Sequence, residues 1–219
     1  MKTKMFFAAI AATLVFSANS FAQDEKTLSI YAGATFVGFA NTNLTHSSPK
    51  IKNSIKWTPI AGAQLGIEKR LGKVSTLWEL EYAKFDYKSH DFDYMDRFNP
   101  ANFDKLDVFS FSGYAGKNIG KGRVSVPLYI GLGLDYLSGY PMHNLSAHIS
   151  AKARVRVYIT NTFGMYVGAT FKYGFLGSKS LWTENSKGEI DKSNSYSIKY
   201  MPLMLEAGMT FSIGKKSDN

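Results

Sequence analysis

Long stretches of the chain alternate apolar and polar residues with a period of two. Between 124 and 136 one parity is apolar throughout, and the other carries glycines and polar residues. Between 147 and 159, Ile149 and Val155 share the apolar parity, while Lys152 and Arg154 lie on the polar one. A helix would spread both sets around its circumference, so the pattern predicts β-strands.

Eight segments of the chain have this character. The apolar side is clear for six of them, and for the first and fourth we place Leu28, Ile30, Ala32, Ala34, Phe36, Phe109 and Phe111 on it. The expected strands cover residues 28–39, 57–69, 74–86, 106–116, 124–138, 147–160, 163–176 and 196–213.

The connections between these segments alternate in length. Longer polar connections are expected at 40–56, 87–105, 139–146 and 177–195, and shorter turns at 70–73, 117–123 and 161–162. An even number of antiparallel strands with this alternation places both termini on the side of the short turns. The sequence predicts an all-β protein, an eight-stranded antiparallel up-and-down β-barrel that forms one domain over residues 23–219.

The amino terminus has the layout of a secretory signal peptide. Lys2 and Lys4 precede an apolar run of about 12 residues, and small residues lead to Ala22. We expect residues 1–22 to be the signal peptide, with cleavage after Ala22. The alternative is an uncleaved membrane anchor, for which the run is short of the roughly 20 residues that a bilayer helix needs.

The face that points inward decides whether the barrel is soluble or in a membrane. A soluble, lipocalin-like barrel turns its apolar parity inward, whereas an outer-membrane barrel turns it toward lipid. The polar parity here is rich in small residues such as Gly131, Gly133, Ser110 and Ser112, which suits a narrow lumen better than a water-facing surface. We therefore expect the apolar parity to face lipid, so that the fold is an eight-stranded antiparallel up-and-down transmembrane β-barrel.

Aromatic residues of the apolar parity gather toward the strand ends. Such positions are typical of a girdle at the membrane interface. The expected interfacial aromatics are Trp57, Trp78, Tyr82, Tyr136, Tyr173, Phe175 and Phe211.

Charged residues also occur on the polar parity, in nearly equal numbers of each sign. In a closed barrel they would meet in a lumen of low dielectric constant, where pairing is favourable and an unpaired charge is costly. On a soluble sheet they would be independent surface charges. The expected lumen charge network consists of Glu68, Glu79, Glu81, Asp135, Lys152, Arg154, Arg156, Lys172 and Glu206.

Composition narrows the function further. The chain has 219 residues, no Cys and a net charge of +9. The absence of Cys excludes disulfides, thiolate metal sites and a Cys-anchored lipoprotein. The basic charge does not indicate nucleic-acid binding, because an exported protein meets little nucleic acid.

With this pattern the chain resembles the small eight-stranded outer-membrane β-barrel proteins, similar to OmpX and the OmpA membrane domain. The resemblance covers residues 28–213. Members of the family end on an aromatic residue that the barrel-assembly machinery reads, whereas this chain continues from Phe211 to Asn219. The resemblance does not imply the peptidoglycan anchor of larger OmpA-type proteins.

Few residues point to chemistry. His148 and Ser150 look similar to the His-x-Ser pair of eight-stranded lipid A deacylases, but they share the parity of the lumen charges, and no acid follows before Glu184. Asp91, Asp93 and Asp96 form an acidic loop more readily than a calcium site. The four His lack zinc spacing, and 116–122 lacks the Gly-Lys-Ser/Thr of a phosphate-binding loop. We expect no catalytic residue, metal or cofactor.

The sequence thus predicts an integral protein of the cell outer membrane whose lumen is filled by side chains. Its role would be structural or in surface interaction through the long loops, with Phe92, Tyr94, Phe98, Phe103 and Trp182 as contact residues. A narrow porin-like channel and a soluble lipocalin-like binding barrel are the alternatives. Expected partners are outer-membrane lipid, including lipopolysaccharide, and the barrel-assembly machinery; a surface partner is not identified.

Overall fold

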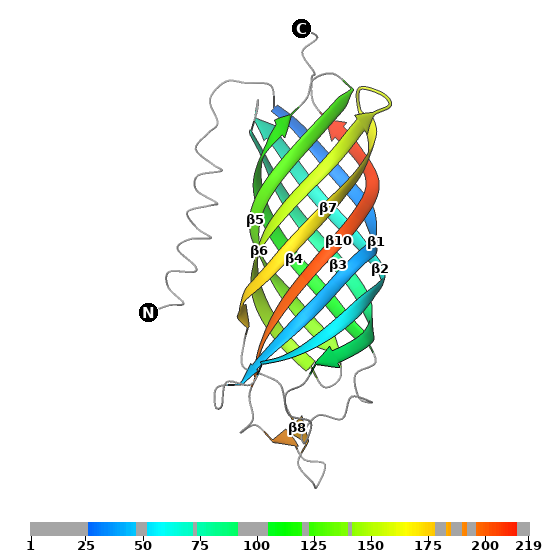
Figure 1. Cartoon of the computed structure of the whole chain (residues 1–219). Helices are drawn as coiled ribbons and strands as arrows, with labels where there is room; N and C mark the ends of the chain where they lie inside the picture. Colours follow the sequence, from blue (N-terminus) through cyan, green and yellow to red (C-terminus); the bar gives the residue numbers. More distant parts are fainter. Residues whose placement is uncertain are drawn as a thin grey trace, which may run out of the picture.

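The chain forms a closed antiparallel β-barrel (Figure 1). A computed structural model describes residues 26–46, 52–71, 74–91, 105–119, 123–139, 142–177, 183–184, 190–191 and 196–213. The barrel strands are β1 (Lys26–His46), β2 (Lys52–Leu71), β3 (Val74–Asp91), β4 (Lys105–Ile119), β5 (Val124–Gly139), β6 (Met142–Tyr158), β7 (Phe163–Gly177) and β10 (Tyr196–Ile213). The predicted fold class is confirmed.

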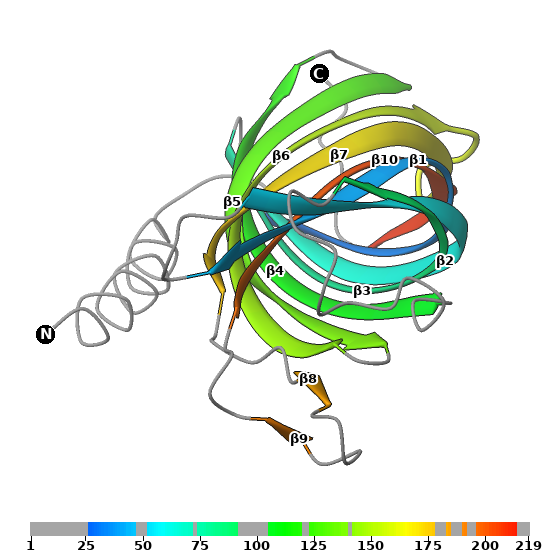
Figure 2. The same ribbon diagram turned by 60° about the horizontal axis from the view of Figure 1, so that its bottom comes forward.

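The ring closes between the first strand and the last. β1 pairs with β10 from Leu28 opposite Ile213 to His46 opposite Tyr196, and each other strand pairs with its neighbours in the chain. Figure 2 looks into this ring. A closed ladder leaves no row of unpaired backbone groups, and only such a sheet can cross the hydrocarbon of a bilayer.

The connections lie at two ends of the barrel. We call the end with 72–73, 120–123 and 159–162 the turn end, and the end with 47–51, 92–104, 140–141 and 178–195 the loop end. The last connection contains a small two-stranded sheet of β8 (Thr183–Glu184) and β9 (Ile190–Asp191), which lies beyond the loop end at the bottom of Figure 1. The sequence had predicted only loop there.

Several strands extend further toward the loop end than the sequence indicated. β1 continues to His46 and β2 begins at Lys52, so most of the loop expected at 40–56 is strand. The connection expected at 139–146 shrinks to residues 140–141, which breaks the predicted alternation of longer and shorter connections. The loops expected at 40–56 and 139–146 were predicted too long. Strand residues that are polar on the outer wall resemble a loop in composition.

Along the barrel, the outward and inward faces of the wall exchange their apolar and polar residues. Over most of the strands the outward side chains are apolar and exposed, among them Leu65, Leu80, Phe111 and Ile130. Nearer the loop end of β2 to β4, the outward positions become polar while the inward ones become apolar. The outward set there is Lys56, Thr58, Lys84, Asp86, Lys105 and Asp107, and the inward set is Ile55, Trp57, Ala83, Phe85, Leu106 and Val108.

Trp57 is therefore not an interfacial aromatic, because its side chain is buried inside the barrel. The β2–β3 register shifts between Pro59 and Ala61, which leaves Ile60 as an extra residue in a β-bulge. A bulge changes which parity faces inward, so the apolar positions that point outward after Ile60 point inward before it. A second shift on β1, between Thr35 and Val37, lies nearby.

The signal peptide expected at 1–22 lies outside the described residues, as do Asp93, Asp96 and the loop aromatics. The described part of the chain contains no helix that is long and apolar enough to cross a membrane.

The outward belt predicts a clear response to charge. Ile130 is 71% exposed near the middle of β5, so Ile130→Arg places a guanidinium among acyl chains. We expect it to lower the free energy of unfolding in lipid vesicles by about 2–4 kcal/mol. The matched control, Thr58→Arg in the polar part of the wall, should change it by less than about 0.5 kcal/mol. Equal losses in a denaturant titration of the two variants would contradict the lipid-facing assignment.

Candidate functional site: a lumen filled by charges and an apolar plug

The structure places all nine predicted network residues inside the barrel, each buried. β6 supplies Lys152, Arg154 and Arg156, which lie two residues apart and so share the inward face. β7 adds Lys172. The carboxylates come from other parts of the wall, with Glu68 on β2, Glu79 and Glu81 on β3, Asp135 on β5 and Glu206 on β10.

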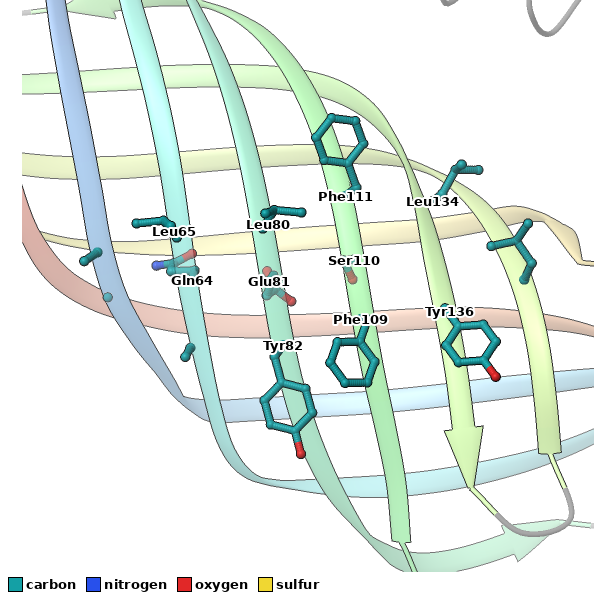
Figure 3. A pocket seen from close by; sticks show the side chains of 14 residues that line it. Gln64, Leu65, Leu80, Glu81, Tyr82, Phe109, Ser110, Phe111, Leu134 and Tyr136 are labelled. Atoms are coloured by element: carbon teal, nitrogen blue, oxygen red, sulfur yellow. The ribbon is translucent and has the colours of Figure 1, made fainter.

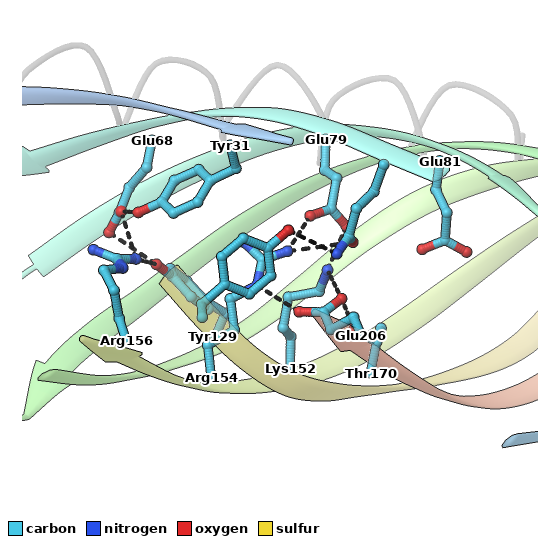
Figure 4. Close-up of polar contacts among 12 residues, drawn as sticks. Tyr31, Glu68, Glu79, Glu81, Tyr129, Lys152, Arg154, Arg156, Thr170 and Glu206 are labelled. Atoms are coloured by element: carbon cyan, nitrogen blue, oxygen red, sulfur yellow. Dashed lines mark hydrogen bonds and ion pairs between the residues drawn. The ribbon is translucent and has the colours of Figure 1, made fainter. Parts of the chain in front are cut away.

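The ion pairs nearest the turn end centre on Glu68 (Figure 4). Arg156 Nη2 donates to Glu68 Oε2 at 2.9 Å, and the Tyr129 hydroxyl donates to Glu68 Oε1 at 2.8 Å. Tyr31 also donates its hydroxyl proton to this carboxylate. The guanidinium of Arg156 lies 4.7 Å from the centre of the Tyr31 ring. Glu68 thus has three donors, which offset the loss of its hydration.

The middle of the lumen holds a four-residue cluster. Arg154 donates from Nε to Glu206 Oε1 and from Nη2 to Glu79 Oε2, both at 2.5 Å. Lys152 Nζ lies 3.0 Å from Glu206 Oε2 and also donates to Glu79. Each carboxylate is shared by both cations, as Figure 4 shows. Two charges of each sign pair with one another in a region with almost no solvent exposure.

A third cluster lies closer to the loop end. Lys172 Nζ is 3.0 Å from Glu81 Oε1 and 3.6 Å from Asp135 Oδ1. The Ser110 hydroxyl donates to Asp135 Oδ1 at 2.5 Å, and His148 Nδ1 lies 2.7 Å from Asp135 Oδ2. His148 lies at this level as well, although the sequence analysis did not include it in the network.

His148 does not act with Ser150 as a His-x-Ser pair. Its Nε2 lies 3.1 Å from Ser112 Oγ on β4, while Ser150 Oγ makes no hydrogen bond in the described structure. Ser112, His148 and Asp135 are therefore connected in the order of a hydrolase triad. His148 and Asp135 have no solvent exposure and Ser112 has 3%, so a substrate does not reach the hydroxyl. The arrangement orients His148 within the lumen.

Glycines of the lumen face make room for these side chains. A Cβ atom at Gly133 would lie 2.6 Å from the His148 ring, and one at Gly208 would lie 2.6 Å from the Tyr166 hydroxyl. The Tyr166 ring lies under the Arg154 guanidinium, 4.5 Å from its centre, and its hydroxyl accepts from Gln64 at 2.9 Å. The glycines of the polar parity thus give space to the large rings and cations of neighbouring strands.

An apolar plug closes the loop end of the lumen. Its members pack against one another with almost no exposure: Ala40, Ile55, Trp57, Ala83, Phe85, Leu106, Val108, Leu137, Tyr200 and Met204. Trp57 Nε1 donates to Thr42 Oγ1 at 3.0 Å, which satisfies its only polar atom. The Phe85 and Tyr200 rings meet edge to face at 5.9 Å. Sequence reasoning missed the plug for two reasons. Ala40 and Ile55 fall in an expected loop and Trp57 on an expected outward face, whereas the other members are apolar residues on the parity that was expected to carry small and charged side chains.

The other predicted interfacial aromatics lie on the outer wall. Trp78 stacks on Phe111 at 5.8 Å, and Tyr82 packs on Phe109 at 4.9 Å. Tyr82 also donates to Asp107 Oδ1 at 2.6 Å. Tyr136, Tyr173 and Phe211 are exposed and Phe175 is partly so. Several of these rings border an open groove of about 740 Å³ that crosses β1 to β6 (Figure 3).

The described residues contain no group of three or more His, Asp or Glu side chains that could hold a metal ion. Asp91 ends β3, and its expected partners Asp93 and Asp96 lie outside the described residues.

A major outer-membrane protein from Thermus thermophilus has a similar structure, with a TM-score of 0.53 and 13% identity over 87% of this chain and all of that one. The chain has the fold of the small outer-membrane β-barrel proteins. Neisserial surface protein A (TM-score 0.46, 13% identity, 84% and 96% of the two chains) and the Escherichia coli outer membrane protease OmpT (0.49, 7%, 85% and 97%) were also found. No protein-family model and no curated protein sequence matches the chain.

The network predicts a large penalty for removing one partner. Arg154→Ala leaves Glu79 and Glu206 with less compensation in a buried site, and we expect the free energy of unfolding to fall by about 3–5 kcal/mol. The control is Arg123→Ala, at an exposed turn position, which should change it by less than about 0.5 kcal/mol. Denaturant titrations in the same detergent compare the two, and unchanged unfolding of Arg154→Ala would contradict the network.

Proposed function

We propose that this protein is a non-conducting, non-enzymatic barrel of the outer membrane, with a role in envelope structure and in surface contacts through its loops. The observation that carries the proposal is the filled lumen. Three ion-pair clusters follow one another from the turn end toward the loop end, and an apolar plug occupies the lumen at the loop end. Eight strands enclose a space that side chains can fill, and here they fill it.

An outer-membrane location is supported by the fold and by the apolar belt. Exposed Leu, Ile, Val, Phe and Met side chains surround the barrel, whereas a soluble lipocalin-like barrel would place such side chains inside. The membrane lipid around this belt, including lipopolysaccharide on the loop side, and the barrel-assembly machinery are the partners we propose. The alternating apolar wall is the surface that lipid would contact.

A surface role is supported by where the connections lie. The connections of 13 and 18 residues, 92–104 and 178–195, are both at the loop end, and in outer-membrane barrels longer loops face the outside of the cell. The strands raise these loops on a wall whose outward residues are polar, such as Lys56, Asp86 and Lys105. Loop aromatics such as Trp182 would then be available for contacts outside the membrane.

The filled lumen predicts an electrically silent barrel. In planar bilayers we expect no steady single-channel steps from the wild-type protein, because the buried clusters and the plug occupy the lumen that water and ions would have to cross. The variant Trp57→Ala/Phe85→Ala/Glu79→Ala/Arg154→Ala removes bulk from both levels and should raise conductance. The control Tyr82→Ala/Phe109→Ala changes only the outer wall and should stay silent. Steady steps from the wild type would favour the alternative of a narrow channel.

The proposed orientation predicts which end of the barrel a reagent added to intact cells can reach. The chain has no Cys, so each introduced thiol is unique. In intact cells a membrane-impermeant maleimide should label Ser186→Cys, in the loop that carries β8 and β9. It should label Lys121→Cys, in a connection at the turn end, only after permeabilisation. The reverse pattern would overturn the surface role.

A further inference from the structure

The positive charge of the protein is concentrated at the turn end. Residues 23–219 carry 24 basic and 17 acidic side chains. Nine basic and three acidic residues fall in the turn-end segments 23–27, 69–73, 117–123, 159–162 and 213–219. The lumen holds four Lys or Arg and five Asp or Glu, and the remaining loop-end segments hold eleven basic and nine acidic residues. The turn end therefore accounts for six of the seven surplus positive charges.

Three basic residues of the turn end, Lys69, Lys117 and Arg123, show where this charge lies on the barrel. Lys69 on β2 and Lys117 on β4 belong to the outward parity on either side of β3, where they lie opposite Thr76 and Val74. Arg123 is exposed, and its carbonyl oxygen accepts a hydrogen bond from the Tyr158 backbone N–H at 2.7 Å. In the described part of the turn end no carboxylate lies on the outer wall, since Glu68 points into the lumen.

These cations begin where the apolar belt ends. Ile67, two residues before Lys69, is 50% exposed, and Val74, opposite Lys117, is 54% exposed. Lysine stems can continue along such a surface while their ammonium groups reach the polar layer of the membrane. At this depth the groups that meet a barrel wall are lipid headgroups.

The loop end lacks this excess because its wall charges are opposed. Lys84 lies opposite Asp107 across β3 and β4, and Lys105 lies opposite Asp86. Neighbouring opposite charges cancel at short range and attract no particular sign of headgroup. The two rims of one barrel thus differ in the lipid that they favour.

We propose that the turn end binds anionic phospholipid, with phosphate headgroups of net negative charge held by Lys69, Lys117 and Arg123. This surface would fix the depth of the barrel in the leaflet that it faces. The binding does not depend on the proposed role of the loops or on a closed lumen.

The fluorescence of Trp78 can report which lipid lies next to the turn end. It lies on the outer wall opposite Ile67, close to Lys69, whereas Trp57 is inside the barrel. In a Trp182→Phe background, Trp78 is the remaining tryptophan within reach of acyl chains. The full chain is reconstituted in mixed vesicles of phosphatidylglycerol and phosphatidylcholine, with one or the other carrying brominated chains. Quenching of Trp78 then gives the relative affinity for the two lipids.

We expect the parent chain to prefer phosphatidylglycerol, with about a fivefold contribution per cation at low salt. The variant Lys69→Gln/Lys117→Gln/Arg123→Gln should lose most of this preference, and raised salt should reduce it in the parent. The matched control Lys56→Gln/Lys84→Gln/Lys105→Gln removes three cations from the loop end and should keep it. A heat-shifted gel checks that every variant is folded.

The proposal is overturned if the parent chain shows no preference, or if both triple variants lose it equally. Sedimentation of the protein with purified peptidoglycan tests the alternative that the basic surface binds a polymer instead of lipid. If the turn-end variant loses that binding while its lipid preference is unchanged, the basic surface serves a polymer and the lipid proposal is wrong.

Discussion

A charge or an unpaired backbone group cannot face acyl chains without a large cost in free energy, and this constraint accounts for most of the structure. The backbone meets it by closing the ladder between β1 and β10. The side chains meet it by turning the charges inward, where Arg154 is shared between Glu79 and Glu206. The lumen then has to replace much of the hydration that these charges lose, and tyrosine and serine hydroxyls accompany the ion pairs.

The same constraint ends where the membrane ends. Toward the loop end, water replaces lipid outside, and the wall of β2 to β4 exchanges its apolar and polar faces. On β3 and β4 the apolar residues of the sequence move from the outward parity to the inward one, as from Leu80 to Phe85 on β3. On β2 the bulge at Ile60 makes the change while the apolar parity of the sequence continues to Trp57. One barrel thus joins an inverted membrane protein to a short segment with an ordinary apolar core.

These two interiors are the basis of the structural role that we propose. The ion pairs hold β6 against β2, β3 and β10, so they connect strands across the lumen, and the plug fills the lumen at the loop end. A triad of Ser112, His148 and Asp135 is among the buried contacts, where it connects β4, β5 and β6. Buried polar contacts of this kind fix the register of the strands.

Local alternation was enough to predict the strands, the outward direction of residues such as Ile130, and the set of charges that would need partners, because strand side chains alternate strictly and the apolar set must face lipid. It could not predict that Arg154 lies between Glu79 and Glu206, or that His148 meets Ser112 and not Ser150. Those contacts depend on the tilt and register that closure imposes on distant strands. Nor could it place Trp57, because a bulge is defined by the partner strand, and only the folded barrel shows which residue has no partner.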